Sequence, residues 1–455
     1  MIQAPVRALL VLSLVAALPA QNCATTSIGA VPLVDLGTGT YQGHTGGLYG
    51  GGQNMPPAAH LASGLARLAS VVARDAAGAP AAGGRIVLLS IGMSNCTQEF
   101  STWLPSSNAD PNRAASVTVV DGAQGGQDAV IVANASAPFW TIVDQRLATA
   151  GVTPAQVQVV WLKEAIAGAG GGFPAGAQQL QGLLGQIVRN VRVRYPNVQL
   201  CFVSSRTYAG YATTSLNPEP YAYESGFAVQ WLIAQQIAGD PLLNCDPAAG
   251  PVTAPWLGWG PYLWTNGTTP RSDGLVWTCA DVQADGTHPS TAGRAKVAAL
   301  LQQFFATSPL AAPWYLGAGS SALFMQYGTG CAGVAGVPNI RSNGAPQLGN
   351  LAFRVGVEHA ASSAIAALWF STATAELAIA GPCSLAIDPA AGLPLLIGVT
   401  SPVGARTEPV PIPVQPSLIG AQLFCQWLVD DSLGTPLPGL QGLATSRGAR
   451  IHVGL

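Results

Sequence analysis

Hydrophobic and polar positions follow two kinds of pattern between residues 58 and 306. Four runs rich in apolar residues are each short enough to be a strand: 85–90, 116–120, 157–162 and 198–204. Four other segments carry apolar residues at the spacing of a helix: 58–73, 174–193, 223–238 and 290–306. Apolar strands that alternate with helices are typical of a parallel sheet covered on both faces. The pattern therefore predicts an α/β domain.

The pattern changes after about residue 313. Helical spacing ends, and Gly, Pro and Asn separate short apolar runs at 351–357, 364–370, 395–400 and 419–429. Short strands at this spacing are typical of an antiparallel β-sandwich. We therefore predict an α/β domain over residues 21–312 and a C-terminal β-sandwich over residues 313–455.

The first twenty residues have the pattern of a secretory signal peptide. Arg7 precedes an apolar stretch over 8–18 that is too short to span a bilayer, and the small residue Ala20 ends the segment. We expect residues 1–20 to be removed and the protein to be secreted or periplasmic. No later stretch is long and apolar enough to be expected to cross a membrane.

Composition excludes several classes of protein. Of the 455 residues, 49% are hydrophobic and 9% charged, which excludes a disordered chain. The chain has 19 Lys and Arg against 21 Asp and Glu, so it offers no basic field for a nucleic acid.

All eight cysteines follow residue 20, and in an oxidising compartment some of them will pair. We expect one bridge between Cys245 and Cys279, which flank an aromatic segment, and one between Cys331 and Cys383. Cys201 lies in an apolar run and is expected to be a buried thiol. The cysteines lack the spacing of a zinc site, and we expect neither a metal nor an organic cofactor.

Two short motifs put reactive side chains where strands end, the edge at which parallel sheets bind ligands. Ser94 follows the first strand within Gly-Met-Ser-Asn (92–95), and such a turn exposes its hydroxyl and its backbone N–H. Asp285 and His288 lie three residues apart before the last helix, so the carboxylate can orient the imidazole. Each motif alone is also compatible with a structural role, such as a helix-capping histidine.

Together, the motif at 92–95, a glycine-rich turn at 121–127 (DGAQGGQ) and Asp-Gly-Thr-His at 285–288 resemble the SGNH (GDSL-like) hydrolase superfamily. The resemblance covers about residues 83–308 and is nearest to the sialate O-acetylesterase-like carbohydrate esterases. It implies a three-layer, flavodoxin-like domain with Ser94 as nucleophile and Asp285 and His288 as its partners. It also implies an oxyanion hole formed by the N–H groups of Ser94 and Gly126, with Gly125 as the alternative glycine.

The third motif of that superfamily, an Asn within Gly-x-Asn-Asp, is replaced here by Trp-Leu-Lys-Glu at 161–164. The resemblance implies that Lys163 takes the place of this Asn as a side-chain donor to the oxyanion. Glu164 could hold Lys163 in position. The alternative is a structural Lys–Glu pair with no catalytic role.

Five further residues are candidates for substrate binding: Asn95, Arg206, Tyr208, Trp264 and Asp273. Trp264 and Asp273 belong to an aromatic segment over residues 251–277 that could offer a flat platform to a sugar. Ion pairing of arginine and packing of the aromatic residues are the structural alternatives.

We therefore predict a secreted serine esterase that acts on short acyl esters, with a small ester or an acylated polysaccharide as its partner. Acetyl esters of carbohydrates are implied by the resemblance alone. The alternative is a non-catalytic carbohydrate-binding or cell-surface protein on the same scaffold. The distances from Ser94 to His288 and from His288 to Asp285 discriminate between the two hypotheses.

Overall fold

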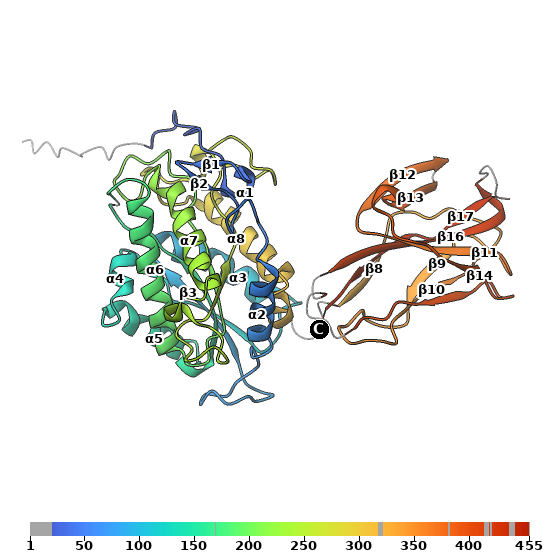
Figure 1. The fold of residues 1–455 in the computed structure, drawn as a ribbon, viewed down its shortest axis with the longest axis horizontal. Coiled ribbons are helices and arrows are strands. Elements are labelled where there is room, and N and C mark those ends of the chain that lie inside the picture. Colours follow the sequence, from blue (N-terminus) through green and yellow to red (C-terminus); the bar gives the residue numbers. More distant parts are fainter. Residues whose placement is uncertain are drawn as a thin grey trace, which may run out of the picture.

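The computed structural model describes residues 21–168, 170–316, 322–380, 383–413, 418, 421–435 and 442–454. The predicted signal peptide lies outside the described residues. Two hydrophobic cores are present, one built from residues 33–315 and one from residues 340–453. Figure 1 shows the corresponding bodies, one of mixed helices and strands and one of strands.

A five-stranded parallel sheet with the order β4-β3-β5-β6-β7 lies at the centre of the first body. Every residue of four of these strands is buried, which confirms that the sheet is covered on both faces. The strands are β3 (Ile86–Gly92), β4 (Val117–Asp121), β5 (Val157–Lys163), β6 (Leu200–Val203) and β7 (Trp256–Trp259).

Two groups of helices cover this sheet. The helix α3 packs against α8, and α6 packs against α4 and α7. Right-handed crossovers put the two groups on opposite faces. The helices are α2 (Ala58–Leu68), α3 (Ser94–Ala109), α4 (Ala129–Ala133), α5 (Pro138–Thr149), α6 (Ala175–Arg194), α7 (Tyr221–Ile237), α8 (Thr291–Thr307) and α9 (Ala312–Tyr315).

The strand β7 was not expected from the sequence, which suggested only an aromatic loop there. Trp256 and Trp259 donate their indole N–H groups to the carbonyls of His60 and Leu48, so each side chain is fixed against a neighbouring segment. Gly258 interrupts the apolar run of this strand, and Pro255 and Gly260 lie on either side of it, so the segment lacks the continuous apolar pattern of the other strands. The first body also contains α1 (Leu33–Leu36), β1 (Thr40–Tyr41), β2 (His44–Thr45) and the 3₁₀ helices η1 (Pro154–Gln156), η2 (Pro241–Leu243) and η3 (Cys279–Asp281).

The second body consists of antiparallel sheets, as the sequence predicted. One has the order β14-β11-β16-β18-β8 with β17 beside β16, a second has the order β15-β10-β9, and β12 pairs with β13. Val355 and Trp427, from two different sheets, share one core. The elements are β8 (Leu323–Tyr327), β9 (Asn339–Ser342), β10 (Arg354–Glu358), β11 (Ile365–Ser371), β12 (Thr374–Ala380), β13 (Cys383–Ile387), η4 (Pro389–Ala391), β14 (Leu396–Val399), β15 (Arg406–Pro409), β16 (Gln422–Thr435), β17 (Leu443–Thr445) and β18 (Gly448–His452).

The first core extends beyond the boundary that we predicted after residue 312. Trp314 and Tyr315 of α9 are buried in it. Tyr315 donates its hydroxyl hydrogen to Ser107 on α3 at 3.0 Å. The domain boundary itself remains a prediction.

One predicted disulfide is confirmed and one is wrong. Cys331 pairs with Cys383, and Cys201 is a buried thiol, both as expected. Cys279, however, pairs with Cys23, and Cys245 is a free buried thiol. The sequence does not reveal that residues 22–28 run beside the loops after β6 and β7, to which Asn22 and Ile28 donate their N–H groups. Among the described helices, none combines the length and apolar character needed to cross a bilayer.

Candidate active site

Ser94 is the first residue of α3 and follows β3 after a single extended residue, Met93. The turn depends on Gly92, because a Cβ there would lie 2.4 Å from both the Cβ of Cys96 and the carbonyl oxygen of Lys163. Without that Cβ, the backbone passes close to the end of β5 and enters the helix at once. The hydroxyl of Ser94 is therefore held at the carboxyl end of β3, next to the central strand β5, and this strand end is the position that the sequence predicted.

Asp285 and His288 lie on the loop between η3 and α8. Gly286 in this loop has φ of +66°, and a Cβ there would lie 1.8 Å from the carbonyl oxygen of Tyr211, so only glycine fits. One oxygen of Asp285 accepts the N–H groups of Thr287 and His288, each at 3.0 Å. The carboxylate thus organises the loop that carries the histidine.

The three side chains form one continuous chain of hydrogen bonds. Nδ1 of His288 lies 2.5 Å from Oδ2 of Asp285, and Nε2 lies 2.8 Å from Oγ of Ser94. Burial would raise the pKa of Asp285, but the hydrogen bonds from His288 and from two backbone N–H groups lower it below its ordinary value. An ionised Asp285 keeps the imidazole proton on Nδ1, which leaves Nε2 free to accept the proton of Ser94.

Asn95 connects the two motifs. Its Nδ2 donates to the carbonyl oxygen of Thr287 at 2.9 Å, which ties the start of α3 to the histidine loop. Its Oδ1 is buried without a hydrogen-bond partner in the described part of the chain. Asn95, which the sequence indicated as a substrate contact, therefore also maintains the spacing between Ser94 and His288.

A cavity of about 240 Å³ opens in front of the Ser94 hydroxyl. Among its lining residues are Asn95, Gly126, Arg206 and His288, all indicated by the sequence. Gly126 has φ of +74°, and a Cβ there would meet no heavy atom within 4 Å. A Cβ on Gly125 would lie 4.0 Å from the Cβ of Ser94. Within the described ranges, the N–H groups of Ser94 and Gly126 donate to no acceptor. Backbone donors that the fold leaves unused, on two residues that line one cavity, are compatible with an oxyanion hole.

Asp128 and Leu216 also line the cavity but were missed in the sequence. Asp128 is the N-cap of α4, and its side chain accepts the N–H of Ile131 at 3.2 Å. Its place soon after β4, at the ligand-binding edge of the sheet, was the signal that could have identified it. Leu216 lies in an irregular loop for which the sequence gives no comparable signal.

Lys163 is not part of the cavity lining. Its side chain is 1% exposed and its ammonium group bonds to the carboxylate of Glu99 on α3, so the pairing with Glu164 that the sequence left open does not form. Successive side chains at a strand end point to opposite faces, which separates Lys163 from Glu164. Burial lowers the pKa of Lys163, although Glu99 opposes this shift, and burial raises the pKa of Glu164 well above its ordinary value.

We expect Lys163→Met to lower the free energy of unfolding by about 3–5 kcal/mol, because it leaves the Glu99 carboxylate buried without its partner. The double variant Lys163→Met/Glu99→Leu removes both charges and should recover most of this loss. Urea unfolding of the wild type, both single variants and the double variant checks the expectation. If Lys163 donates a hydrogen bond to the oxyanion, the folded double variant should also show a kcat about a hundredfold lower than that of the wild type.

Tyr208, Trp264 and Asp273 do not line the cavity, and the structure gives each a structural contact. The hydroxyl of Tyr208 donates to the carbonyl oxygen of Thr25 at 2.8 Å. Trp264 donates its indole N–H to Glu219, and Asp273 forms an ion pair with Arg271. The aromatic segment packs the N-terminal residues onto the domain, which is the structural alternative that the sequence left open.

Glu219 makes the stability of this region depend on pH. Burial raises its pKa to about 7, although the N–H groups of Ala209, Tyr223 and Trp264 oppose the shift. Because the folded pKa lies above the ordinary value of 4.5, the folded state binds the proton more tightly than the unfolded state. The resulting stabilisation is complete below about pH 4.5 and is lost as the pH rises through about 7.

We therefore expect the wild type to lose more free energy of unfolding than Glu219→Gln when the pH rises from 5 to 8. Glutamine keeps an oxygen acceptor but cannot ionise, so the variant isolates the titration of this carboxyl. Urea unfolding of both proteins at four pH values measures the difference. Parallel curves for the two proteins would show that Glu219 does not titrate in this interval.

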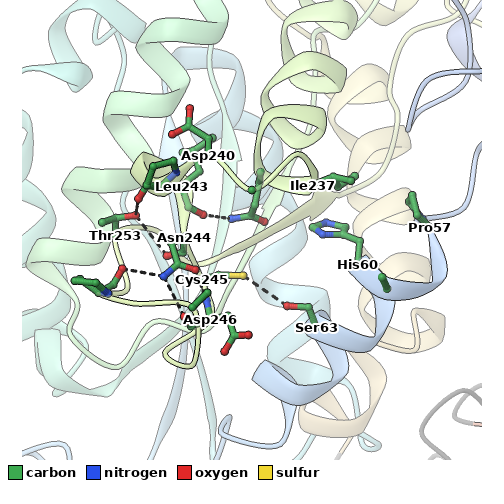
Figure 2. Close-up of a pocket in the computed structure, with 16 residues that line it drawn as sticks. Pro57, His60, Ser63, Ile237, Asp240, Leu243, Asn244, Cys245, Asp246 and Thr253 are labelled. Carbon is green, nitrogen blue, oxygen red and sulfur yellow. Dashed lines mark hydrogen bonds between the residues drawn. The ribbon is translucent and has the colours of Figure 1, made fainter.

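A second and larger cavity, of about 500 Å³, lies beside α2 and the loop after η2 (Figure 2). His60 and Ser63 both face it, but His60 bonds to the carbonyl of Leu257 through Nε2 and stacks on Trp256. Ser63 instead contacts the thiol of Cys245, with 3.7 Å between Oγ and Sγ. The serine and histidine of this cavity are therefore not paired with each other. No group of three or more His, Cys, Asp and Glu side chains in the described ranges is placed to hold a metal ion.

No protein-family model matches this chain, and no curated protein matches it. Among solved structures, it is similar to the periplasmic domain of a lipopolysaccharide acetyltransferase from Salmonella ser. Paratyphi A, with 13% identity and a TM-score of 0.27 over 49% of this chain and 84% of that one. It is similar to a proposed acylhydrolase from Bacteroides fragilis, with 13% identity and a TM-score of 0.29 over 55% and 97% of the two chains.

A third similar structure is that of a gut microbial diltiazem-metabolizing enzyme, with 10% identity and a TM-score of 0.30 over 69% of this chain and 63% of that one. None of the three is described as a sialate O-acetylesterase, so that finer resemblance stays a prediction. Because all three TM-scores are below 0.5, the function of this protein has to be argued from the geometry of its own site.

Proposed function

We propose that this protein is a serine esterase that hydrolyses short acyl esters. The observation that carries the proposal is the hydrogen-bond chain from Ser94 through His288 to Asp285, in a cavity that Gly126 also lines. A serine, a histidine and a carboxylate in this order activate the hydroxyl for attack on a carbonyl. A non-catalytic binding protein has no need of an aligned proton acceptor, so the geometry favours the enzyme.

In the first half of the reaction, Oγ of Ser94 attacks the ester carbonyl carbon while Nε2 of His288 takes the hydroxyl proton. The carbonyl oxygen becomes an oxyanion, which the N–H groups of Ser94 and Gly126 stabilise. The C–O bond to the alcohol then breaks, and His288 returns its proton to the departing oxygen. Asp285 stabilises the imidazolium during this step without itself taking the proton.

In the second half, water attacks the acyl group on Ser94 with His288 again as the base. The tetrahedral intermediate forms in the same oxyanion hole, and its collapse releases the carboxylic acid and restores the Ser94 hydroxyl. Both halves use the same proton acceptor and the same donors. Apart from the ester and water, both halves use only side chains and N–H groups of this chain.

The size of the cavity supports a short acyl group. A volume of about 240 Å³ has to hold both the acyl group and the part of the alcohol next to the ester bond. We propose acetyl esters of a carbohydrate as the substrate, on the resemblance of the motifs alone. Two disulfides support a secreted or periplasmic protein, since such bridges persist in oxidising compartments.

Hydrolysis of p-nitrophenyl acetate by the purified protein, measured beside its Ser94→Ala variant, tests the proposal. Turnover that depends on Ser94 supports a serine esterase. A wild-type protein that releases no p-nitrophenol above the Ser94→Ala background would favour the non-catalytic alternative.

A further inference from the structure

Arg206 lies in the same cavity as Ser94 and His288, shortly after the end of β6. Its side chain is 1% exposed. Its Nε is enclosed without a hydrogen-bond partner, and no hydrogen bond from its guanidinium to any described residue exists. No carboxylate oxygen of the described residues lies within 4 Å of it, so the positive charge of Arg206 has no direct counter-ion.

A buried guanidinium in this state is unusual, because removing the charge from water is costly unless it is paired. Arg271, which is also buried, shows the ordinary arrangement in this protein. It donates to both oxygens of Asp273 and to the carbonyl oxygen of Tyr262. Arg206 therefore has the donors of a built anion site but lacks the acceptor.

Burial lowers the pKa of Arg206, and the nearby carboxyl groups of Glu99, Glu164, Glu219 and Asp285 oppose that shift without contacting the guanidinium. Glu99 pairs with Lys163, Asp285 holds His288, and Glu219 accepts N–H groups from three residues. Glu164 accepts the N–H of Ala165 through Oε2, while its Oε1, like that of Glu99, is buried without a described partner. None of these groups neutralises the guanidinium by direct contact.

Asp128 also lines the cavity, but its oxygens accept the N–H groups of Ile131 and Ala167. Its carboxylate is therefore satisfied at the start of α4. It helps to order the loop after β4 and does not pair with Arg206.

We propose that Arg206 binds a carboxylate on the alcohol part of the ester substrate. The inference rests on the proposed esterase function and adds a substrate class to it, namely esters of hydroxy-carboxylates. Arg206 can offer two parallel N–H donors to the two oxygens of a carboxylate. A bound carboxylate would supply the acceptor that the cavity lacks.

The order of the strands separates Arg206 from the oxyanion hole. Ser94 follows β3, and Gly126 follows β4 on one side of it. Arg206 follows β6, which lies on the other side of β3 with β5 between them. An oxyanion held by Ser94 and Gly126 points towards β4, so Arg206 meets a different part of the substrate. With a short acyl group, that part is the alcohol.

The experiment compares two acetyl esters, 4-acetoxybenzoate and its methyl ester, which differ by one negative charge and one methyl group. We expect Arg206→Gln to lower kcat/KM for 4-acetoxybenzoate tenfold to a hundredfold, the usual effect of losing charge-assisted hydrogen bonds. The value for the methyl ester should stay within about twofold of the wild type. Arg206→Lys should recover part of the loss, because it restores the charge without the planar donors.

Arg113→Gln is the matched control. One terminal nitrogen of Arg113 is also buried without a described partner, but Arg113 lines a cavity with Val117, at the start of β4 and the opposite edge of the sheet. The substitution Arg113→Gln should change kcat/KM for neither ester. A loss of equal size for both esters in Arg206→Gln, or no loss for either, would overturn the proposal.

Binding to the Ser94→Ala protein separates this inference from the esterase function. Calorimetry should show at least tenfold tighter binding of 4-hydroxybenzoate than of the neutral 4-hydroxybenzamide, and Arg206→Gln should abolish the difference. This measurement requires no turnover. Equal binding of the two compounds to the Ser94→Ala protein would refute the carboxylate site even if the wild type is an esterase. Tighter binding of 4-hydroxybenzoate, together with a wild type that hydrolyses neither ester, would refute only the esterase function.

Discussion

Ser94→Ala is expected to lower kcat for p-nitrophenyl acetate by about four orders of magnitude or more, with the fold unchanged. The hydroxyl of Ser94 is the only group in the proposed mechanism that can form the acyl intermediate. Its hydrogen bond to His288 is partly exposed to solvent, so its removal should shift Tm by no more than a few degrees. Steady-state kinetics and thermal unfolding of the same preparation measure both quantities.

Ser63→Ala provides the control for this experiment. Ser63 lies beside a histidine-containing cavity as well, but its hydroxyl contacts Cys245 and not His60. Its replacement should leave kcat within about twofold of the wild type. The opposite result, with Ser63→Ala inactive and Ser94→Ala active, would indicate that the reaction takes place in the larger cavity of Figure 2.

Asp285→Asn is expected to lower kcat by about 10⁴ while leaving KM nearly unchanged. The amide oxygen can still accept the N–H groups of Thr287 and His288, so the loop keeps its shape. The amide NH₂ would then face Nδ1 of His288 and donate to it. The imidazole would be held with its proton on Nε2, where it cannot accept the proton of Ser94.

Asp273→Asn is a suitable control, because Asp273 forms an ion pair with Arg271 outside the cavity. The substitution Asp273→Asn should change the free energy of unfolding slightly and leave kcat unchanged. An Asp285→Asn variant whose kcat lies within tenfold of the wild type, at unchanged Tm, would show that the carboxylate does not orient the histidine.

The sequence predicted those parts of the site that depend on local order along the chain. Ser94 and the Asp285–His288 pair could be identified because strand ends and helix starts are visible as patterns, and parallel strands bring their carboxyl ends together. Gly126, with Gly125 as the alternative, was implied by the resemblance of the motifs. Four of the five strands of the parallel sheet were predicted from their apolar runs, but their order was not.

Other features depend on contacts between distant segments and left no such pattern. The partner of Lys163 is Glu99, 64 residues earlier on a helix, whereas the neighbouring Glu164 points away. Arg206 could be placed at the ligand edge of the sheet, but its lack of a counter-ion is visible only when all surrounding carboxylates are located. For the same reason, the sequence suggested substrate contacts for Tyr208 and Trp264, whose polar atoms instead bond to Thr25 and Glu219.

The bridge between Cys23 and Cys279 restricts the order of events by which the chain can be oxidised. Cys96, Cys201 and Cys245 lie between the two partners in sequence, and all three remain buried thiols in the folded domain. A chain oxidised as it emerges would offer Cys96 to Cys23 long before Cys279 is available. The native bridge must therefore form after folding has buried the three thiols, or by exchange from an earlier bridge. Burial of the competing thiols, and not their order of synthesis, selects the partner of Cys23.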